Sequence, residues 1–197
     1  GPTICSGGGE TWKLAACGKA TTGREVKIES PGPQHVAGEI ICRGSNLMLG
    51  YYKSAEATSQ IIDVNGWLHT GDLATMDADG YVTVRGRSKN MLLTSSGQNI
   101  YPEEIESKLN NMPYVSESLI VLQHDKLVAL IYPDFDDAFA HGLQQTDIEK
   151  AMEANRNELN LLLPAYCQIT KVKIHFEEFE KTAKKSIKRF MYQEAKG

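Results

Sequence analysis

Gly66-Trp67-Leu68-His69-Thr70-Gly71-Asp72-Leu73 is followed closely by Asp79-Gly80-Tyr81 and then by Gly86-Arg87-Ser88-Lys89. These segments place an acid, Asp72, and a base, Arg87, one short hairpin apart, each beside a glycine. A carboxylate can accept hydrogen bonds from two neighbouring sugar hydroxyls, and a guanidinium can hold a phosphate or sugar oxygen with a planar fork of donors. The residues predict half of a nucleotide site, and the other half is not evident elsewhere in the chain.

The first part of the chain is typical of short strands and turns. Val26 and Ile28 alternate with charged residues, and an apolar strand resumes at 38–42. Residues 54–62 have helical composition. A hairpin is predicted over 73–85, because Asp-Gly favours the positive backbone angles that a tight turn requires.

The pattern changes after Gly86. Proline at the first helical position and acids in the first turn predict a helix from Pro102. Apolar runs at 118–122 and 127–132 predict a second hairpin, and 146–149 reads as a capping box that opens a second helix. A last strand is predicted near the C-terminus, where apolar residues alternate at Val172, Ile174 and Phe176.

The predicted fold class is therefore α+β. A β-rich part over residues 1–86 precedes a compact helix, strand, strand, helix, strand unit over residues 87–197. The predicted boundary lies at 87–89, where the period of the apolar residues changes.

Composition limits the classes of function. The 197 residues are 41% hydrophobic and 23% charged, which is ordinary for a globular protein. A net charge of −4 gives no reason to expect nucleic acid, which requires a basic face. No apolar run approaches the ~20 residues of a transmembrane helix, and no signal peptide is visible.

The cysteines and the first residues indicate the setting of the chain. Cys5, Cys17, Cys42 and Cys167 are scattered, so neither a metal site nor a disulfide framework is expected. Free thiols in a reducing cytoplasm are the interpretation that we adopt. Because the chain opens on Gly1 without a start signal, we expect it to begin partway through a larger protein.

Each candidate residue also has an ordinary structural interpretation. Asp72 alone could be a turn residue or a helix cap, and Arg87 a solvated side chain. The Ser95-Ser96-Gly97-Gln98-Asn99 segment could be a plain loop. Trp67 and the pair Tyr51-Tyr52 are expected in the core. His69 has no partner at metal spacing, so a structural role is expected for it.

Taken together and in order, the motifs are far more specific. The chain resembles the later core motifs of the adenylate-forming superfamily, which includes acyl-CoA synthetases, luciferases and the adenylation domains of peptide synthetases. The matching segments are Gly38-Glu39-Ile40, Gly44, Gly50-Tyr51-Tyr52, Gly66 to Asp72, Asp79-Gly80-Tyr81, Gly86-Arg87-Ser88-Lys89 and Ser96 to Glu106. The resemblance covers essentially the whole chain.

The resemblance implies a fold and a reaction. It implies that residues 1–86 end a large N-terminal domain with a β-barrel-like subdomain, and that residues 87–197 form a small mobile lid. Such enzymes first join a carboxylate to the α-phosphate of ATP, giving an acyl-adenylate and pyrophosphate. A thiol then displaces AMP.

The resemblance also implies residue roles. Asp72 is similar in position to the carboxylate that binds both ribose hydroxyls, and Arg87 to the neighbouring basic nucleotide contact. Lys89 matches the hinge about which the lid rotates between half-reactions. Ser96, Gly97 and Gln98 would lie on the CoA side and help line the pantetheine tunnel.

The chain departs from the family pattern in two ways. The phosphate-gripping loop and the Tyr-Gly-x-Thr-Glu segment are absent, so we expect a fragment that is inactive alone. Near the C-terminus, Ser186 stands where the family carries its adenylation lysine. Lys185 is the candidate catalytic residue, with Lys184 and Lys188 as alternatives, because an ammonium suits negative charge shared by several oxygens.

The implied activity is that of an AMP-forming acid–thiol ligase. The ending from Phe179 to Tyr192 looks most like bacterial long-chain fatty acid–CoA ligases. The implied ligands are ATP or AMP, CoA, a fatty acid and Mg²⁺, with ATP and Mg²⁺ bound mainly through the missing N-terminal part. The alternatives are a non-catalytic nucleotide-binding or interaction module, or an adenylation domain for another carboxylic acid.

Overall fold

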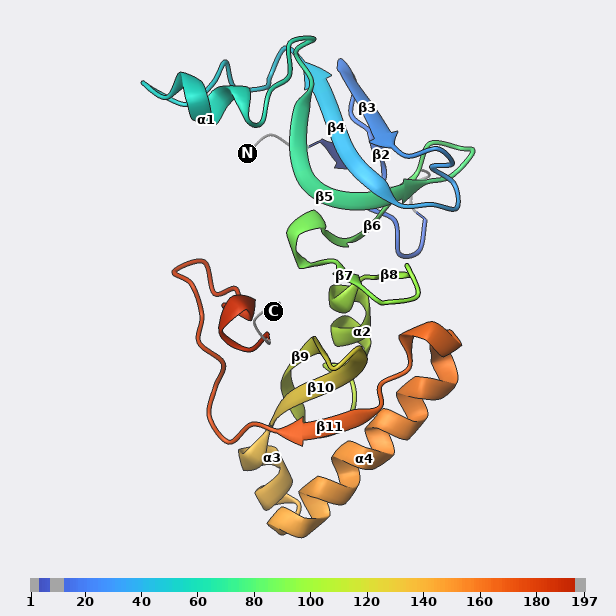
Figure 1. Cartoon of the computed structure of the whole chain (residues 1–197), viewed down its shortest axis with the longest axis vertical. Coiled ribbons are helices and arrows are strands. Elements are labelled where there is room, and N and C mark those ends of the chain that lie inside the picture. The colour runs from blue at the N-terminus through green and yellow to red at the C-terminus, as the bar shows by residue number, and fades with distance from the viewer. Residues whose placement is uncertain (1–3, 8–12, 194–197) are drawn as a thin grey trace. The chain divides into compact units, whose positions relative to one another are not determined.

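The computed structural model describes residues 4–7 and 13–193. The chain divides into two compact units, Gly1–Lys89 and Asn90–Gly197 (Figure 1). The division falls after Lys89, the last residue of the predicted boundary at 87–89. Among the described residues, no helix is both long enough and apolar enough to cross a membrane.

A four-stranded antiparallel sheet forms the centre of the first unit. Its order is β3-β4-β5-β6, with neighbours in the chain also neighbours in the sheet. The strands are β3 (Arg24–Glu29), β4 (Gly38–Gly44), β5 (Leu68–Met76) and β6 (Val82–Arg87). The two predicted strands and the predicted hairpin are therefore present.

Three smaller elements complete the first unit. The two-residue strands β1 (Cys5–Ser6) and β2 (Lys19–Ala20) pair with each other. Helix α1 covers only Ala55–Ser59 and buries no side chain, so it is shorter than the 54–62 prediction. Without an apolar face against the sheet, helical composition alone does not sustain a longer helix.

The core of the first unit is small. Ile28, Ile40, Ala74 and Val82 form its buried cluster. Trp67 is buried as expected. The expectation for the tyrosine pair was wrong, because Tyr51 is 51% exposed and Tyr52 is 87% exposed. Tyr51 forms an isolated bridge with Ser54, and its amide donates to Thr58 Oγ1 at 2.9 Å, so the pair lies in a short turn that is not part of the four-stranded sheet.

The second unit is built on a three-stranded sheet ordered β11-β10-β9. Strands β9 (Val115–Gln123) and β10 (Lys126–Pro133) form the predicted antiparallel hairpin. Strand β11 (Lys171–Ile174) adds parallel to β10. Short strands β7 (Leu92–Leu93) and β8 (Asn99–Ile100) pair separately.

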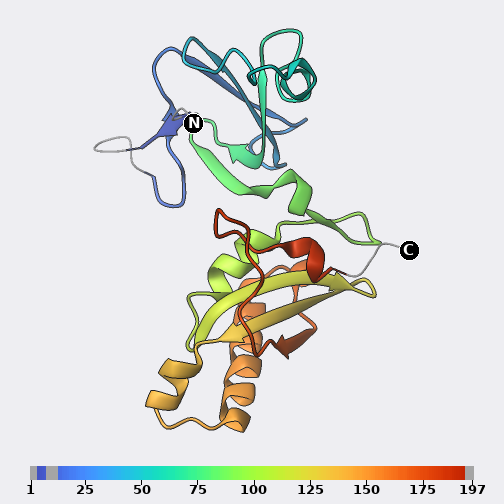
Figure 2. The ribbon, with the colours of Figure 1, turned by 90° about the vertical axis from the view of Figure 1, so that its left-hand side faces the viewer.

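The helices of the second unit cover one face of this sheet, as Figure 2 shows for the long helix. They are α2 (Pro102–Leu109), α3 (Phe135–Ala140) and α4 (Gln145–Leu162). Single 3-10 turns occur at Ser88–Asn90, Ala165–Cys167 and Arg189–Met191. Helix α3 has no counterpart in the prediction; Asp134 caps it by accepting from the Asp137 amide.

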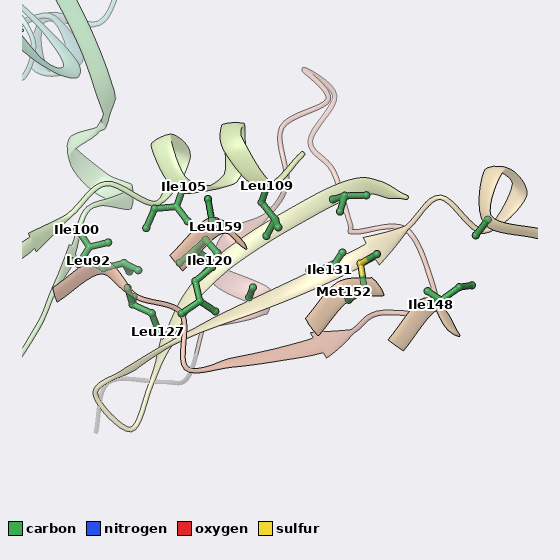
Figure 3. Close-up of a cluster of buried hydrophobic side chains, with 14 residues drawn as sticks. Leu92, Ile100, Ile105, Leu109, Ile120, Leu127, Ile131, Ile148, Met152 and Leu159 are labelled. Atoms are coloured by element: carbon green, nitrogen blue, oxygen red, sulfur yellow. The ribbon is translucent and has the colours of Figure 1, made fainter. Parts of the chain in front are cut away.

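Both faces of the sheet are buried, which explains the nearly continuous apolar runs in β9 and β10. On one face, Ile120 and Ile131 pack against Ile105, Leu109 and the apolar stripe of α4 (Figure 3). On the other face, strand neighbours of those residues pack against Phe179. Each large side chain so buried stabilises the unit by about 1.5–3 kcal/mol.

Two local expectations in this unit were wrong. The capping box that opens α4 joins Gln144 and Asp147, not residues 146 and 149. The backbone amide of Gln144 donates to Asp147 Oδ2 at 3.2 Å. The N-cap of the helix therefore lies two residues before the predicted one. Phe176 lies beyond the end of β11 and is 59% exposed, because it stacks with Phe135 outside the sheet.

Candidate functional site

The register of β5 and β6 places Asp72 directly opposite Arg87. Arg87 Nε lies 2.7 Å from Asp72 Oδ1, and the two side chains are 54% and 32% exposed respectively. A β-bulge between Leu73 and Ala74 adjoins the pair, and bulges re-aim the side chains beside them. The structure thus brings together the two residues predicted to contact the nucleotide.

The chemistry of this pair suits a polar, anionic ligand. The guanidinium carries five N–H donors in a fixed plane, and its Nε is committed to Asp72. The Asp72 carboxylate, an acceptor with two oxygens, can accept hydrogen bonds from hydroxyl groups. A sugar hydroxyl pair and a nearby phosphate oxygen fit these two groups.

A second layer of side chains fixes the backbone that carries Asp72. Glu39 Oε1 accepts from the Gly71 amide at 2.7 Å, and Thr70 Oγ1 donates to the Ile40 carbonyl at 2.8 Å. Gly71 has a φ of +72°, where other residues would be strained. Glu39 had no assigned role in the sequence analysis, because nothing local shows that its carboxylate reaches the next strand.

His69 lies between two carboxylates on this sheet. Its Nδ1 is 3.1 Å from Glu39 Oε2 and 3.9 Å from Glu29 Oε2. The ligand atoms of Glu29, Glu39 and His69 all lie within 4.8 Å of one another, a group that could hold a metal ion and that the sequence spacing did not reveal. Because Glu29 and Glu39 are direct cross-strand partners, their like charges repel.

The hydrogen bonds of this group favour a proton over a metal ion. Glu39 uses one oxygen for Gly71 and the other for His69, so a metal would have to break the His69–Glu39 contact. The bond to Glu39, and then the charges of Glu39 and Glu29, raise the pKa of His69. When protonated, the imidazole of His69 therefore offsets the charges of the two opposed carboxylates.

Lys89 is the last residue of the first unit and lies in the 3-10 turn Ser88–Asn90. The next residue, Asn90, belongs to the second unit, where its side-chain amide donates to Glu103 Oε1 at 2.6 Å. The predicted hinge residue thus stands where the chain passes from one compact unit to the other.

The predicted CoA-side residues Ser96, Gly97 and Gln98 lie in an exposed loop between β7 and β8. The loop closes on Thr94, whose carbonyl accepts from the Gly97 amide at 2.9 Å and whose hydroxyl accepts from the Gln98 amide at 3.1 Å. Gly97 has a φ of +78°. The loop is consequently a defined turn with its amides directed inward.

The candidate lysine lies in a tight hairpin near the C-terminus. Lys181 and Ile187 form an antiparallel bridge, and the Lys185 amide donates to the Thr182 carbonyl at 2.9 Å. Lys185 has a φ of +59°, a left-handed conformation that favours glycine. Ser186 follows it and donates its amide to Thr182 Oγ1 at 3.3 Å.

Ion pairs separate the lysines of this hairpin into two groups. Lys181 pairs with Glu117 at 2.7 Å, and Lys188 pairs with Glu180 at 3.3 Å. Within residues 4–7 and 13–193, no carboxylate forms an ion pair with Lys184 or Lys185, and both side chains are exposed. In this structure the Lys188 ammonium is thus engaged by Glu180, whereas the ammonium groups of Lys184 and Lys185 are available.

A largely buried ion pair, which the sequence analysis missed, holds the segment after this hairpin. Arg189 Nη2 contacts Glu106 Oε2, and Glu106 Oε1 accepts from the Ile120 amide at 2.7 Å. Burial, which outweighs the effect of Arg189, raises the pKa of Glu106. The available signal was Glu106 itself, an acid one position after the buried Ile105 on the apolar side of α2.

A small α+β unit with this strand and helix order is the C-terminal domain of adenylate-forming enzymes. The model of the AMP-binding enzyme C-terminal domain matches residues 89–195. The chain belongs to this family of AMP-binding enzymes.

Curated relatives carry names of CoA ligases. A 3-[(3aS,4S,7aS)-7a-methyl-1,5-dioxo-octahydro-1H-inden-4-yl]propanoyl:CoA ligase of Rhodococcus jostii is 46% identical over 104 residues, which are 53% of this chain and 19% of that protein. The putative acyl-CoA synthetase YngI of Bacillus subtilis is 44% identical over 114 residues, 55% of this chain and 21% of that protein. The chain thus spans about a fifth of the length of these relatives.

A solved structure shows the same fold over nearly the whole chain. The anthranilate CoA ligase AuaEII in complex with anthranoyl-AMP superposes with a TM-score of 0.76 at 26% identity, covering 96% of this chain and 35% of that one. Other relatives are named for other acids, among them a long-chain-fatty-acid–CoA ligase of Gallus gallus, 33% identical over 62% of this chain and 16% of that protein. The names therefore point to CoA ligases without a common acid.

Proposed function

We propose that this chain is part of an AMP-forming acid–thiol ligase that activates a long-chain fatty acid with ATP and transfers it to CoA. The observation that carries the proposal is the Asp72–Arg87 pair, held in register on β5 and β6 in a chain of the AMP-binding family. In this role Asp72 accepts hydrogen bonds from both ribose hydroxyls, and Arg87 contacts the adjoining phosphate or sugar oxygen.

The first half-reaction joins an oxygen of the fatty carboxylate to the α-phosphorus of ATP and breaks the bond to the β-phosphate, which releases pyrophosphate. Lys185 supplies an ammonium to the negative charge that the acid and the α-phosphate share. Its exposure and the absence of an ion-pair partner among the described residues support this role. Mg²⁺ would accompany the phosphates of ATP.

The described residues offer no dedicated Mg²⁺ site beside Asp72. Their group of potential ligands at Glu29, Glu39 and His69 includes an imidazole and carboxylate oxygens that are already hydrogen-bonded. Mg²⁺ prefers oxygen ligands and commonly binds through substrate phosphates with one or two carboxylates.

In the second half-reaction the sulfur of CoA attacks the acyl carbon and AMP leaves. We assign the CoA side to the loop with Ser96, Gly97 and Gln98, and the hinge between the two half-reactions to Lys89. The relative of Gallus gallus named for long-chain fatty acids supports the choice of acid. A cytoplasmic location accords with the four free cysteines.

A second candidate function follows from Ser186. If no lysine of the hairpin serves adenylation, the protein is a non-catalytic nucleotide-binding module. Nucleotide binding is common to both candidates, whereas acid-dependent release of AMP belongs to the ligase alone.

The test of the nucleotide site is the substitution Asp72→Ala in the complete polypeptide that contains this chain. Loss of two hydrogen bonds to a charged acceptor, each worth ~1.5–3 kcal/mol, should weaken AMP binding measured by calorimetry. Asp79→Ala, at an exposed turn on the same hairpin, is the matched control and should leave AMP affinity unchanged. Equal AMP affinity in the wild type and Asp72→Ala would remove Asp72 from the site.

A further inference from the structure

The turn between β9 and β10 has an unusual backbone for its residues. Gln123 pairs with Lys126, so the turn consists of His124 and Asp125 alone. Their φ values are +49° and +59°. Two-residue hairpin loops with positive φ at both positions strongly prefer Asn-Gly, Asp-Gly or Gly-Gly. Asp125 therefore occupies a position where glycine would relieve strain.

The carboxylate of Asp125 contacts a segment 30 residues away in sequence. Asp125 Oδ1 accepts from the Ser95 amide at 2.8 Å, and Oδ2 accepts from the Ser95 hydroxyl. These bonds, the one from the hydroxyl first, lower the pKa of Asp125, so the carboxylate is ionised at neutral pH. One side chain thus holds two donors of Ser95.

Ser95 belongs to the loop assigned to the CoA side. Hydrogen bonds within 94–98 close the loop on itself. Among the residues that the structure describes, the two bonds to Asp125 are the ones that join this loop to an element beyond its own strands β7 and β8. The position of the loop relative to the central sheet therefore depends on Asp125.

We propose that Asp125 is a positioning residue for thiol transfer, which holds the loop of Ser96, Gly97 and Gln98 in place for CoA. The inference rests on the proposed function, because that function assigns the loop to CoA. It adds a residue outside the family motifs and explains a strained turn: the carboxylate requires a side chain at a position that backbone energetics alone would give to glycine.

The discriminating variant is Asp125→Gly in the complete polypeptide. Glycine adopts the observed backbone without strain, so relief of the turn offsets part of the stability lost with the two bonds, and the protein should stay folded. The loop loses both bonds, and both are charge-assisted because their acceptor is the ionised Asp125 carboxylate. We expect KM for CoA to rise about tenfold or more, while fatty-acid-dependent pyrophosphate release in the absence of CoA keeps its rate.

Three comparisons separate positioning from turn stability. His124→Gly relieves the same turn and retains the Asp125 carboxylate with both bonds to Ser95, so its KM for CoA should stay closer to that of the wild type than to that of Asp125→Gly. Asparagine at position 125 tolerates the left-handed backbone and keeps an acceptor for the Ser95 amide. The KM for CoA of Asp125→Asn should therefore lie between those of the wild type and Asp125→Gly. Ser95→Ala removes only the hydrogen bond from the Ser95 hydroxyl, so its KM for CoA should also be intermediate.

An unchanged KM for CoA in Asp125→Gly, in an enzyme whose wild type forms acyl-CoA, would overturn the inference and leave the proposed function standing. Equal loss of pyrophosphate release and thiol transfer would overturn it as well, since it would show a general structural role. A wild type that forms neither AMP nor acyl-CoA would overturn the proposed function, and the inference with it.

Discussion

At the scale of single residues, the sharpest prediction concerns Lys184 and Lys185, the lysines of the C-terminal hairpin that form no ion pair with a described residue. Lys185→Gly removes the ammonium and suits the left-handed φ, so the hairpin should stay folded. Loss of one group that stabilises transition-state charge typically costs about 10²–10³-fold in rate. We expect that loss in pyrophosphate release, with thioester formation from preformed acyl-adenylate unchanged.

Lys184→Ala is the matched control, because Lys184 is equally exposed and lies in the same turn. It should adenylate at the wild-type rate. Adding Ser186→Lys to Lys185→Gly should restore adenylation, since it moves an ammonium by one position in the hairpin. A slow Lys184→Ala variant beside a normal Lys185→Gly variant would transfer the role to Lys184.

His69 predicts a pH dependence of stability. Its pKa is raised above the ordinary value of 6.5 by Glu39 and then Glu29. A group with a raised folded pKa contributes its stability fully below the unfolded pKa and loses it as pH rises through the folded value. The urea midpoints of the wild type and His69→Gln should therefore differ at pH 5.5 and converge at pH 8.5. A constant difference would contradict this account.

Two site residues illustrate what residue-level reasoning can and cannot find. Asp72 and Arg87 were predicted together because a short hairpin brings its two ends into register. Glu39 and Glu106 were not found, because each acts on a backbone amide far along the chain, at Gly71 and Ile120. Such contacts depend on strand pairing and helix docking, which local sequence does not specify.

At the scale of elements, α2 is held to β9 and the C-terminal segment through Glu106. Glu106→Ala would leave the Arg189 guanidinium largely buried without its partner, which typically costs about 3–5 kcal/mol. We expect a loss of this size in the free energy of unfolding measured with urea. Ser107→Ala, on the exposed side of the same helix, should change stability by less than about 0.5 kcal/mol.

The double variant Glu106→Ala with Arg189→Met provides the contrast. Removing both charges avoids an unpaired buried charge, so it should cost less than Glu106→Ala alone. A larger cost in the double variant would show that packing, rather than the ion pair, holds the C-terminal segment.

The elements themselves were predictable where their signals are local. The β9–β10 hairpin and α2 follow from apolar runs and from Pro102 at the helix start. The parallel pairing of β11 with β10 was not predicted, since it is set by the return of the chain after α4. Helix α3 was missed because it is short; it begins after its N-cap, Asp134.

At the scale of the whole molecule, the passage between the two units at Lys89 is the predicted hinge. Lys89→Pro fixes φ near −65° at this residue and restricts Ser88 before it. If the lid rotates here between half-reactions, pyrophosphate release should continue while acyl-CoA formation stops. Lys89→Ala, which keeps the backbone free, should support both steps; normal CoA ester formation by Lys89→Pro would refute the hinge.

We propose that this chain serves a ligase that makes acyl-CoA through an adenylate. The most direct measurement is release of AMP by the complete polypeptide, supplied with ATP, CoA and fatty acids of graded chain length. AMP and acyl-CoA should then form in equal amounts, and only with a long-chain acid. Nucleotide binding without AMP release at any chain length would contradict it and favour the non-catalytic nucleotide-binding module.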